Sequence, residues 1–220
     1  LWEKKKEEEA RNRKIQNKLR KIEEEIEKLN EQLAILEEKM SQPEKYANEI
    51  ADGTLYQAYE KIKNEIEAEI GDLIIGIEHV GSTSVKGLSA KPCIDIDVII
   101  RDYSVFDEIV RKLGAIGYIH EGDLGIKDRE AFRYTDKTHL MLHHLYVCPQ
   151  YSKELHRHIT FRDFLRHNPD AVKEYSMVKE KAAELYPDNI DKYIGYKSPC
   201  IEKLYKKCGF FWIQPNTHII

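Results

Sequence analysis

Long apolar runs are missing from this sequence, and their absence argues against a membrane-spanning protein. No stretch approaches the ~20 consecutive apolar residues that a spanning helix needs. The opening residues, LWEKKKEEEA, also lack the apolar core of a signal peptide. We therefore expect a cytoplasmic protein that does not enter a membrane.

Paired cysteines and a strong net charge are missing as well. The four cysteines include no Cys-x-x-Cys pair, which weakens zinc and redox interpretations and favours a reduced protein. The formal net charge of -4 argues against a general polyanion binder, although it is compatible with a local basic groove. With 220 residues, the chain is long enough for one sizeable domain and an appendage.

Glycine and proline are absent from residues 1–40, which carry 11 acidic and 11 basic residues. Apolar residues there alternate spacings of four and three, which keeps one narrow seam facing a partner helix. The seam consists of Ile15, Leu19, Ile22, Ile26, Leu29, Leu33, Leu36 and Met40. This pattern predicts a coiled-coil helix over residues 1–42 and, through it, a homodimer. An intramolecular helical hairpin packed on the domain is the alternative.

Residues 50–208 alternate helical and strand-like patterns, which predicts one α+β domain. Helices are predicted over 54–70, 103–114, 152–167, 170–186 and 189–207, the first from apolar residues at Leu55, Tyr59, Ile62, Ile66 and Ile70. Strands are predicted over 73–80, 93–100, 118–121, 130–134 and 139–147. The apolar tail, 209–220, is expected to dock on the domain or on a partner.

The stretch HVGSTSVKGLSAKPCIDIDVII, residues 79–100, carries the chemistry. On a strand, Asp95 and Asp97 point to the same face, where two adjacent carboxylates repel each other. A divalent cation removes that repulsion, and oxygen ligands suit Mg²⁺ or Mn²⁺. The plainer alternative is a pair of aspartates on a solvated sheet edge.

The Gly-Ser-Thr-Ser turn that precedes this strand offers backbone N–H groups and hydroxyls to an anion. Lys91 adds a positive charge nearby. Phosphate on one side and metal on the other is the arrangement that nucleotidyl transfer requires. The alternative for the turn alone is an ordinary structural turn.

The same stretch resembles the signature of the GrpB family, a group with the DNA-polymerase-β-like nucleotidyltransferase fold. The likeness continues in GDLGIKDREAF (122–132), HHLYVCP (143–149), FRDFLRHNPDAVKEYSMVK (161–179) and YIGYKSPCIEKL (193–204). It covers roughly residues 50–208. It implies a mixed β-sheet flanked by helices, followed by a C-terminal helical bundle.

Two departures from the family pattern bear on the site. Lys86 stands where the family usually has proline, and Asp97 stands where many relatives have an apolar residue. The superfamily usually adds a third carboxylate from a neighbouring strand, and HLMLHHLYV contains none. His143 is the candidate replacement, because imidazole can ligate Mn²⁺. A general base and a buried structural histidine are its alternatives.

The resemblance implies a metal-dependent nucleotidyltransferase that uses Mg²⁺ or Mn²⁺, with Asp95, Asp97 and His143 as metal-binding and catalytic residues. The implied nucleotide-binding residues are Gly81, Ser82, Thr83, Ser84, Lys91, Arg129 and Arg162. Lys179 and Lys197 are further phosphate-binding candidates, although each basic residue is alternatively a surface ion-pair partner. The substrate would be an NTP or another phosphorylated small molecule, and an RNA acceptor is compatible with it. A nucleotide-binding pseudoenzyme and a coiled-coil adaptor are the alternative functions.

Overall fold

The computed structural model describes residues 53–209 continuously, together with Trp2, Gln16, Lys18, residues 20–22 and Ile26. The chain divides into two units, residues 1–42 and 43–220. The described residues of the first unit are helical. Most of the predicted coiled coil, and the tail beyond Gly209, lie outside the described residues. The coiled coil, the homodimer and the docking of the tail therefore stay predictions.

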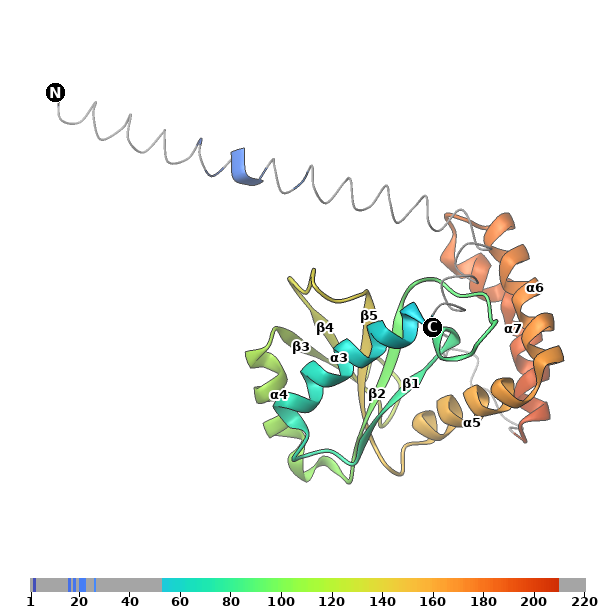
Figure 1. Cartoon of the computed structure of the whole chain (residues 1–220), viewed down its shortest axis with the longest axis horizontal. Coiled ribbons are helices and arrows are strands. Elements are labelled where there is room, and N and C mark those ends of the chain that lie inside the picture. Colours follow the sequence, from blue (N-terminus) through green and yellow to red (C-terminus); the bar gives the residue numbers. More distant parts are fainter. Residues whose placement is uncertain are drawn as a thin grey trace. The chain divides into compact units, whose positions relative to one another are not determined.

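A five-stranded mixed sheet organises the second unit (Figure 1). Its strands are β1 (Gly76–Val80), β2 (Ile94–Ile100), β3 (Tyr118–Gly122), β4 (Glu130–Tyr134) and β5 (His143–Pro149). Their order is β1-β2-β5-β4-β3. The β2–β5 pair is parallel and the other neighbours are antiparallel. The predicted α+β class is confirmed.

The helices match the predicted ranges closely. They are α3 (Thr54–Ile70), α4 (Phe106–Ala115), α5 (Lys153–His167), α6 (Pro169–Leu185) and α7 (Ile190–Lys207), with short 3₁₀ turns η1 (Ser82–Ser84) and η2 (Tyr103–Val105). All five apolar residues predicted for the first helix are buried in α3. Within the described part of the chain, no helix is long and apolar enough to cross a membrane.

Two strands begin later than predicted, for local reasons. The amide of Leu73 donates a hydrogen bond to the carbonyl of Ile70, so the chain is still turning there and β1 starts at Gly76. The amide of Leu140 likewise donates to Lys137, which closes a turn before β5. Apolar residues at 73–75 and 140–142 imitate a strand because a short apolar run does not by itself distinguish a strand from a turn whose side chains pack partly buried against the core.

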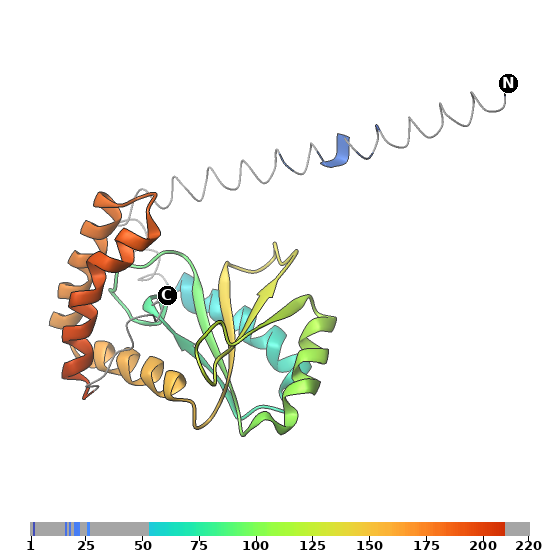
Figure 2. The same ribbon diagram turned by 180° about the vertical axis from the view of Figure 1, so that it is seen from behind.

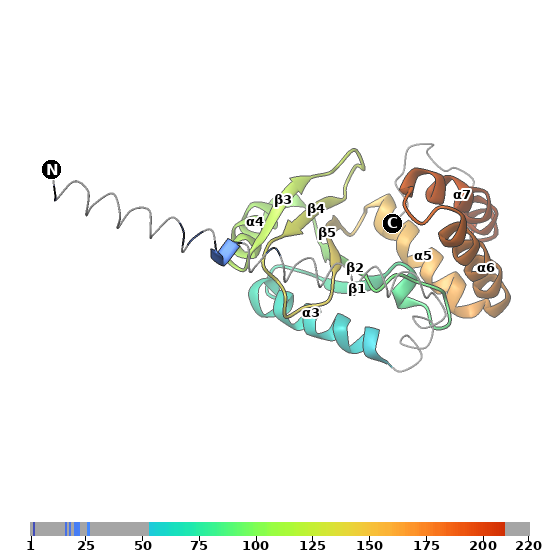
Figure 3. The same ribbon diagram turned by 90° about the horizontal axis from the view of Figure 1, so that it is seen from above.

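The two faces of the sheet pack against different helices. One face, with Ile96, Val98 and Leu145, joins α3 and α4 in the main hydrophobic core. The opposite face contacts α5 through Tyr146 and Cys148. Helices α5, α6 and α7 gather on the side away from α4 (Figures 2 and 3) and share a second core with Val85 and Leu88. The site lies between this helical half and the sheet.

Candidate functional site

The register of the central strands decides which side chains share the site. Asp95 pairs with His144, and Asp97 pairs with Tyr146, in the parallel β2–β5 ladder. Paired residues of neighbouring strands point to the same face of the sheet. Asp95, Asp97 and His144 therefore face the helical half of the domain.

Asp95 is held closely against the glycine turn that follows β1. Its side chain is 10% exposed, and its Oδ1 lies 2.9 Å from His144 Nδ1. A Cβ atom placed on Gly81 would lie 2.0 Å from Asp95 Oδ2. Gly81 has φ 68° and ψ -171°, a conformation that essentially only glycine adopts. The glycine thus permits the close approach of turn and carboxylate.

We predict that Gly81→Ala destabilises the domain and displaces Asp95. Backbone strain alone should lower the free energy of unfolding by about 1–3 kcal/mol, and the clash with Asp95 adds to it. Gly87→Ala is the matched control, because Gly87 also has positive φ but has no atoms near its Cβ position. Urea unfolding of the two variants checks this, and equal stability would contradict it.

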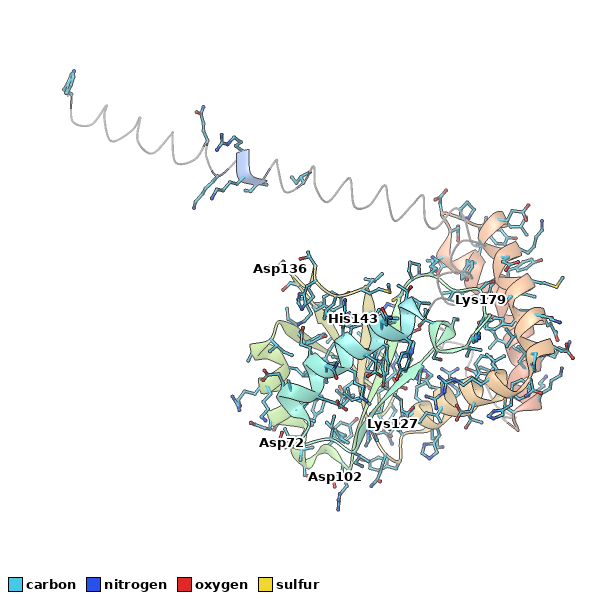
Figure 4. The ribbon with its side chains drawn as sticks, viewed as in Figure 1. Asp72, Asp102, Lys127, Asp136, His143 and Lys179 are labelled. Atoms are coloured by element: carbon cyan, nitrogen blue, oxygen red, sulfur yellow. The ribbon has the colours of Figure 1, made fainter. Side chains whose placement is uncertain are left out.

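Lysines converge on the other side of the same turn. Lys179 Nζ donates a hydrogen bond to Ser82 Oγ at 2.5 Å. Lys179 and Lys197 are only 7% and 3% exposed, and neither forms a salt bridge with a described residue. Lys91 is exposed, and its ammonium lies 5.5 Å from the centre of the Tyr193 ring. Figure 4 shows Lys179 on the helical side of the domain.

These buried amines are electrostatically unfavourable without an anion. Burial, and then the charge of Lys197, lower the pKa of Lys179 to about 7, although Asp95 opposes the shift. Burial, and then Lys91, lower the pKa of Lys197 to about 8. Like charges in a poorly solvated place disfavour the charged form. A bound anion would relieve that cost.

A cavity lies beside Ser82, the residue to which Lys179 donates its hydrogen bond. Its volume is about 50 Å³, larger than the ~10–15 Å³ that one ordered water needs. Its wall includes Gly81, Ser82, Asp95, Tyr146, Phe161 and Tyr175. The wall therefore combines polar groups with aromatic surface that suits a flat ring.

The remaining residues of the turn serve its own structure. Thr83 Oγ1 donates to the carbonyl of Cys93 at 3.1 Å and lies 3.0 Å from His79 Nε2. Ser84 Oγ donates to the carbonyl of Gly81 at 2.6 Å. Of the predicted turn residues, Gly81 and Ser82 line the cavity. The Thr83 hydroxyl instead connects the turn to Cys93 and His79, and the Ser84 hydroxyl bonds within the turn.

The two predicted arginines have different surroundings. Arg162 lines the cavity, but Glu78 and Asp163 already pair with its guanidinium. Arg129 is buried, with its guanidinium carbon 4.4 Å from the centre of the Tyr146 ring. Its Nε and Nη1 have no hydrogen-bond partner among the described residues. Neither arginine donates to Ser82 as Lys179 does.

Asp97 belongs to a separate ion-pair network. It is fully buried, and His158 Nδ1 donates to its Oδ2 at 2.7 Å. The other ring nitrogen of His158 lies 3.2 Å from Glu154 Oε1. Burial alone lowers the pKa of His158, but Asp97, and then Glu154, raise it to about 9. His158 is therefore charged at neutral pH and neutralises Asp97 without a metal.

His143 lies on the opposite face of the sheet from the aspartates, beside Tyr118 of the main core. Its Nε2 lies 2.8 Å from the hydroxyl of Tyr118, and its Nδ1 lies 2.8 Å from the carbonyl of Met141. Burial lowers its pKa to about 4, so it is neutral. The predicted grouping of His143 with the aspartates is therefore corrected, because the strand register turns His144 toward Asp95 instead.

Cys93 is a functional candidate that the sequence interpretation missed. Its Sγ lies 3.5 Å from His144 Nδ1. Side-chain hydrogen bonds with Asp95, and then Cys93, raise the pKa of His144 to about 10. The available signal was the spacing of Cys93 two residues before Asp95, which places both on one face of an extended chain.

A two-carboxylate Mg²⁺ or Mn²⁺ site does not fit this arrangement. His158 holds one oxygen of Asp97, and Asp97 does not line the cavity. Its Oδ1 is buried without a described hydrogen-bond partner, yet no surface of the side chain is exposed. Asp95 is the carboxylate of the pair that remains available to a ligand.

Comparison with known proteins identifies relatives of this chain. A family model described as GrpB protein matches residues 51–207. The UPF0157 protein YqkA of Bacillus subtilis is 32% identical over 146 residues, 66% of this chain and 42% of YqkA. The chain thus spans less than half of that relative. The glutamate-rich protein GrpB of Alkalihalophilus pseudofirmus is 33% identical over 66% of this chain and 86% of its own.

A solved structure agrees with these relatives. The crystal structure of the conserved protein GrpB from Enterococcus faecalis matches with a TM-score of 0.62 and 31% sequence identity. The match covers 70% of this chain and 92% of the Enterococcus chain. The similarity therefore extends over nearly the whole of that protein.

Proposed function

This chain belongs to the GrpB family, and from that premise we propose that it binds a nucleoside triphosphate beside Asp95 and transfers the nucleotidyl group to an acceptor. The likeness of its Gly-Ser turn and Asp-x-Asp strand to nucleotidyltransferases supports the reaction type. The geometry of the cavity supports the class of substrate. The acceptor is a separate question, because one fold serves many acceptors.

One observation carries the proposal: two buried ammonium groups, Lys179 and Lys197, lack a carboxylate partner among the described residues. Buried charges are normally paired, because desolvation of an unpaired charge is costly. Lys179 already donates to Ser82, at the turn expected to bind phosphate. The β- and γ-phosphates of an NTP would supply the missing negative charge.

The cavity beside Ser82 would orient the base of the nucleotide. Phe161 and Tyr175 provide aromatic surface for the base. The α-phosphorus would then lie toward Asp95. The hydroxyl oxygen of the acceptor attacks this phosphorus, the bond to the bridging oxygen breaks, and pyrophosphate leaves with the bonding electrons. Lys179 and Lys197 offset the charge that builds up on the pyrophosphate.

A divalent ion at Asp95 would add Lewis-acid stabilisation of the transferring group. Gly81 fixes where the carboxylate lies, as its close approach to Asp95 requires. The proton of the acceptor hydroxyl passes to solvent. In this proposal Asp97 positions His158 and α5 rather than contacting the nucleotide.

A nucleotide-binding pseudoenzyme is the second candidate, and the engagement of Asp97 by His158 favours it. Such a protein would bind the triphosphate without turnover and pass the bound state to a partner. Incubation with each α-labelled NTP, divalent ions and candidate acceptors, including RNA, separates the two. Label transfer with pyrophosphate release supports the enzyme, binding without transfer supports the pseudoenzyme, and absence of binding supports an adaptor.

We predict that Lys179→Met raises the KM for NTP by about 10- to 100-fold, the loss of one charged hydrogen bond. In the wild type, kcat/KM should fall as pH rises through about 7, because free Lys179 loses its proton there. This part of the pH profile should disappear in the variant. Steady-state kinetics from pH 6 to 9 measure both effects.

Lys181→Met is the matched control on the same helix, because Lys181 is exposed and pairs with Glu184. Its KM and pH profile should follow those of the wild type. An unchanged KM in Lys179→Met would remove Lys179 from the nucleotide site.

A further inference from the structure

We propose that Cys93, Asp95 and His144 form a binding site for a divalent transition metal of the zinc class. The claim that this ion takes part in nucleotidyl transfer rests on the proposed function. The claim that the three residues bind an ion rests only on the geometry of their side chains. The metal site expected from the sequence shares only Asp95 with this group.

Strand register brings the three donors together. Cys93 comes two residues before Asp95, and the β2–β5 ladder sets His144 directly beside Asp95. The thiol, carboxylate and imidazole donor atoms all lie within 4.8 Å of one another. Asp95 and His144 lie on adjacent strands of one sheet and Cys93 immediately precedes β2, which gives a rigid base for a metal.

The separations are close to those of a tetrahedral site. Bond lengths of about 2.0–2.3 Å at tetrahedral angles put ligand atoms roughly 3.4–3.6 Å apart. His144 Nδ1 lies 3.5 Å from Cys93 Sγ and 2.9 Å from Asp95 Oδ1. The distance between His144 Nδ1 and Asp95 Oδ1 would increase by roughly 0.5 Å when the ion binds. A rotation of the His144 ring allows this increase, because the side chain is 46% exposed.

The donor set selects the kind of metal. A thiolate is a soft ligand that suits Zn²⁺, and imidazole suits Zn²⁺ and its neighbours, whereas Mg²⁺ prefers oxygen ligands. Three protein donors leave a fourth tetrahedral position, which is typical of catalytic zinc sites. Of the three ligands Asp95 lines the cavity, and on that side a phosphate oxygen would take the fourth position.

Neighbouring groups hold the ligands in place before any ion binds. The carbonyl of Cys93 accepts a hydrogen bond from Thr83 Oγ1 at 3.1 Å. The amide of Cys93 donates to the carbonyl of Lys91 at 2.8 Å. Asp95 Oδ2 lies against Gly81. Thr83, expected to bind nucleotide, thus fixes the backbone of the thiol ligand. Such supporting contacts commonly change metal affinity by about 10- to 100-fold.

Metal titration of the tag-free full chain tests the site. After chelation and dialysis, the wild type should bind about one equivalent of Zn²⁺, as a single mononuclear site requires. Co²⁺ should bind at the same place and give a thiolate-to-cobalt charge-transfer band.

Variants of the ligands test which residues bind the metal. Cys93→Ser should abolish the charge-transfer band. Cys93→Ser and His144→Asn should each weaken Zn²⁺ binding by more than the ~100-fold that loss of a supporting contact causes. Cys200→Ser and His156→Asn are the matched controls and should bind as the wild type does.

Thiol protection provides a readout that needs no variant. Zn²⁺ should protect Cys93 from iodoacetamide, measured by mass spectrometry, while Cys200 and Cys208 react unchanged. Lack of protection, or full Zn²⁺ affinity in folded Cys93→Ser and His144→Asn, would overturn the site. Zinc binding without label transfer would leave the site standing and refute the proposed function. Nucleotidyl transfer with Mg²⁺, in a protein that binds no zinc, would support the proposed function and refute the zinc site.

Discussion

Replacing Asp95 with asparagine is expected to lower the rate of nucleotidyl transfer by about 10²- to 10³-fold, the usual effect of losing one major electrostatic contact to a transition state. Asp95 is the carboxylate that both lines the cavity and contacts His144. The isosteric amide keeps the shape and removes the charge that would hold the ion. Single-turnover kinetics at saturating NTP measure the effect on the transfer step itself.

Asp107→Asn is the control for a neutralised carboxylate, because Asp107 is exposed in the first turn of α4, on the other side of the sheet. Its rate should match the wild type. Asp95→Glu should not restore activity, because Gly81 leaves no room for a longer side chain at Asp95 Oδ2. Full transfer in folded Asp95→Asn would refute the mechanism.

Replacing Asp97 with asparagine is expected to destabilise the domain by about 3–5 kcal/mol near pH 6, the usual cost of breaking a buried ion pair. Asp97 is fully buried, and His158 donates to it at 2.7 Å. Without Asp97, the charged imidazole keeps only its longer contact with Glu154. Urea unfolding followed by circular dichroism gives the free energy of unfolding.

The same pair predicts a pH dependence. The pKa of His158 rises from 6.5 in the unfolded chain to about 9 in the fold. Its stabilisation is therefore complete below about pH 6.5 and is lost as pH rises toward 9, on the order of 3 kcal/mol in total. Wild-type stability should fall across this window, and that of Asp97→Asn should fall less.

A double-mutant cycle with His158→Gln isolates the interaction. The double variant should lose less free energy of unfolding than the two single variants lose together, because it leaves neither the Asp97 carboxylate nor the His158 imidazolium buried without its partner. If Asp97→Asn lowers the free energy of unfolding by less than about 1 kcal/mol at pH 6, the buried ion pair is contradicted. The same loss at pH 6 and pH 9.5 would show that the effect comes from packing instead.

Much of the fold could be predicted from the sequence because its patterns are local. Leu55, Tyr59 and Ile62 recur at helical spacing, and the helix they predict is α3. Alternation in Ile94–Ile100 correctly places Asp95 and Asp97 on one face of β2. Each of these patterns depends on residues a few positions apart, whose geometry the backbone period sets.

The partners of the site residues required the tertiary structure. His143 and His144 are adjacent in a strand, and only the register of β5 against β2 turns His144 to Asp95. A shift of one residue would have exchanged their faces. The role of Asp97 likewise depends on where α5 places His158, 61 positions away in the chain.

The sequence by itself determined the α+β class, the family, and the glycine turn and aspartate strand that define the site. Only the tertiary structure decided that Lys179 reaches Ser82 across 97 positions, and that Cys93 meets His144 across 51. Local periodicity selects helices and strands, because neighbouring residues share one backbone conformation. Contacts between distant residues depend on how those elements pack, and packing is a property of the whole core.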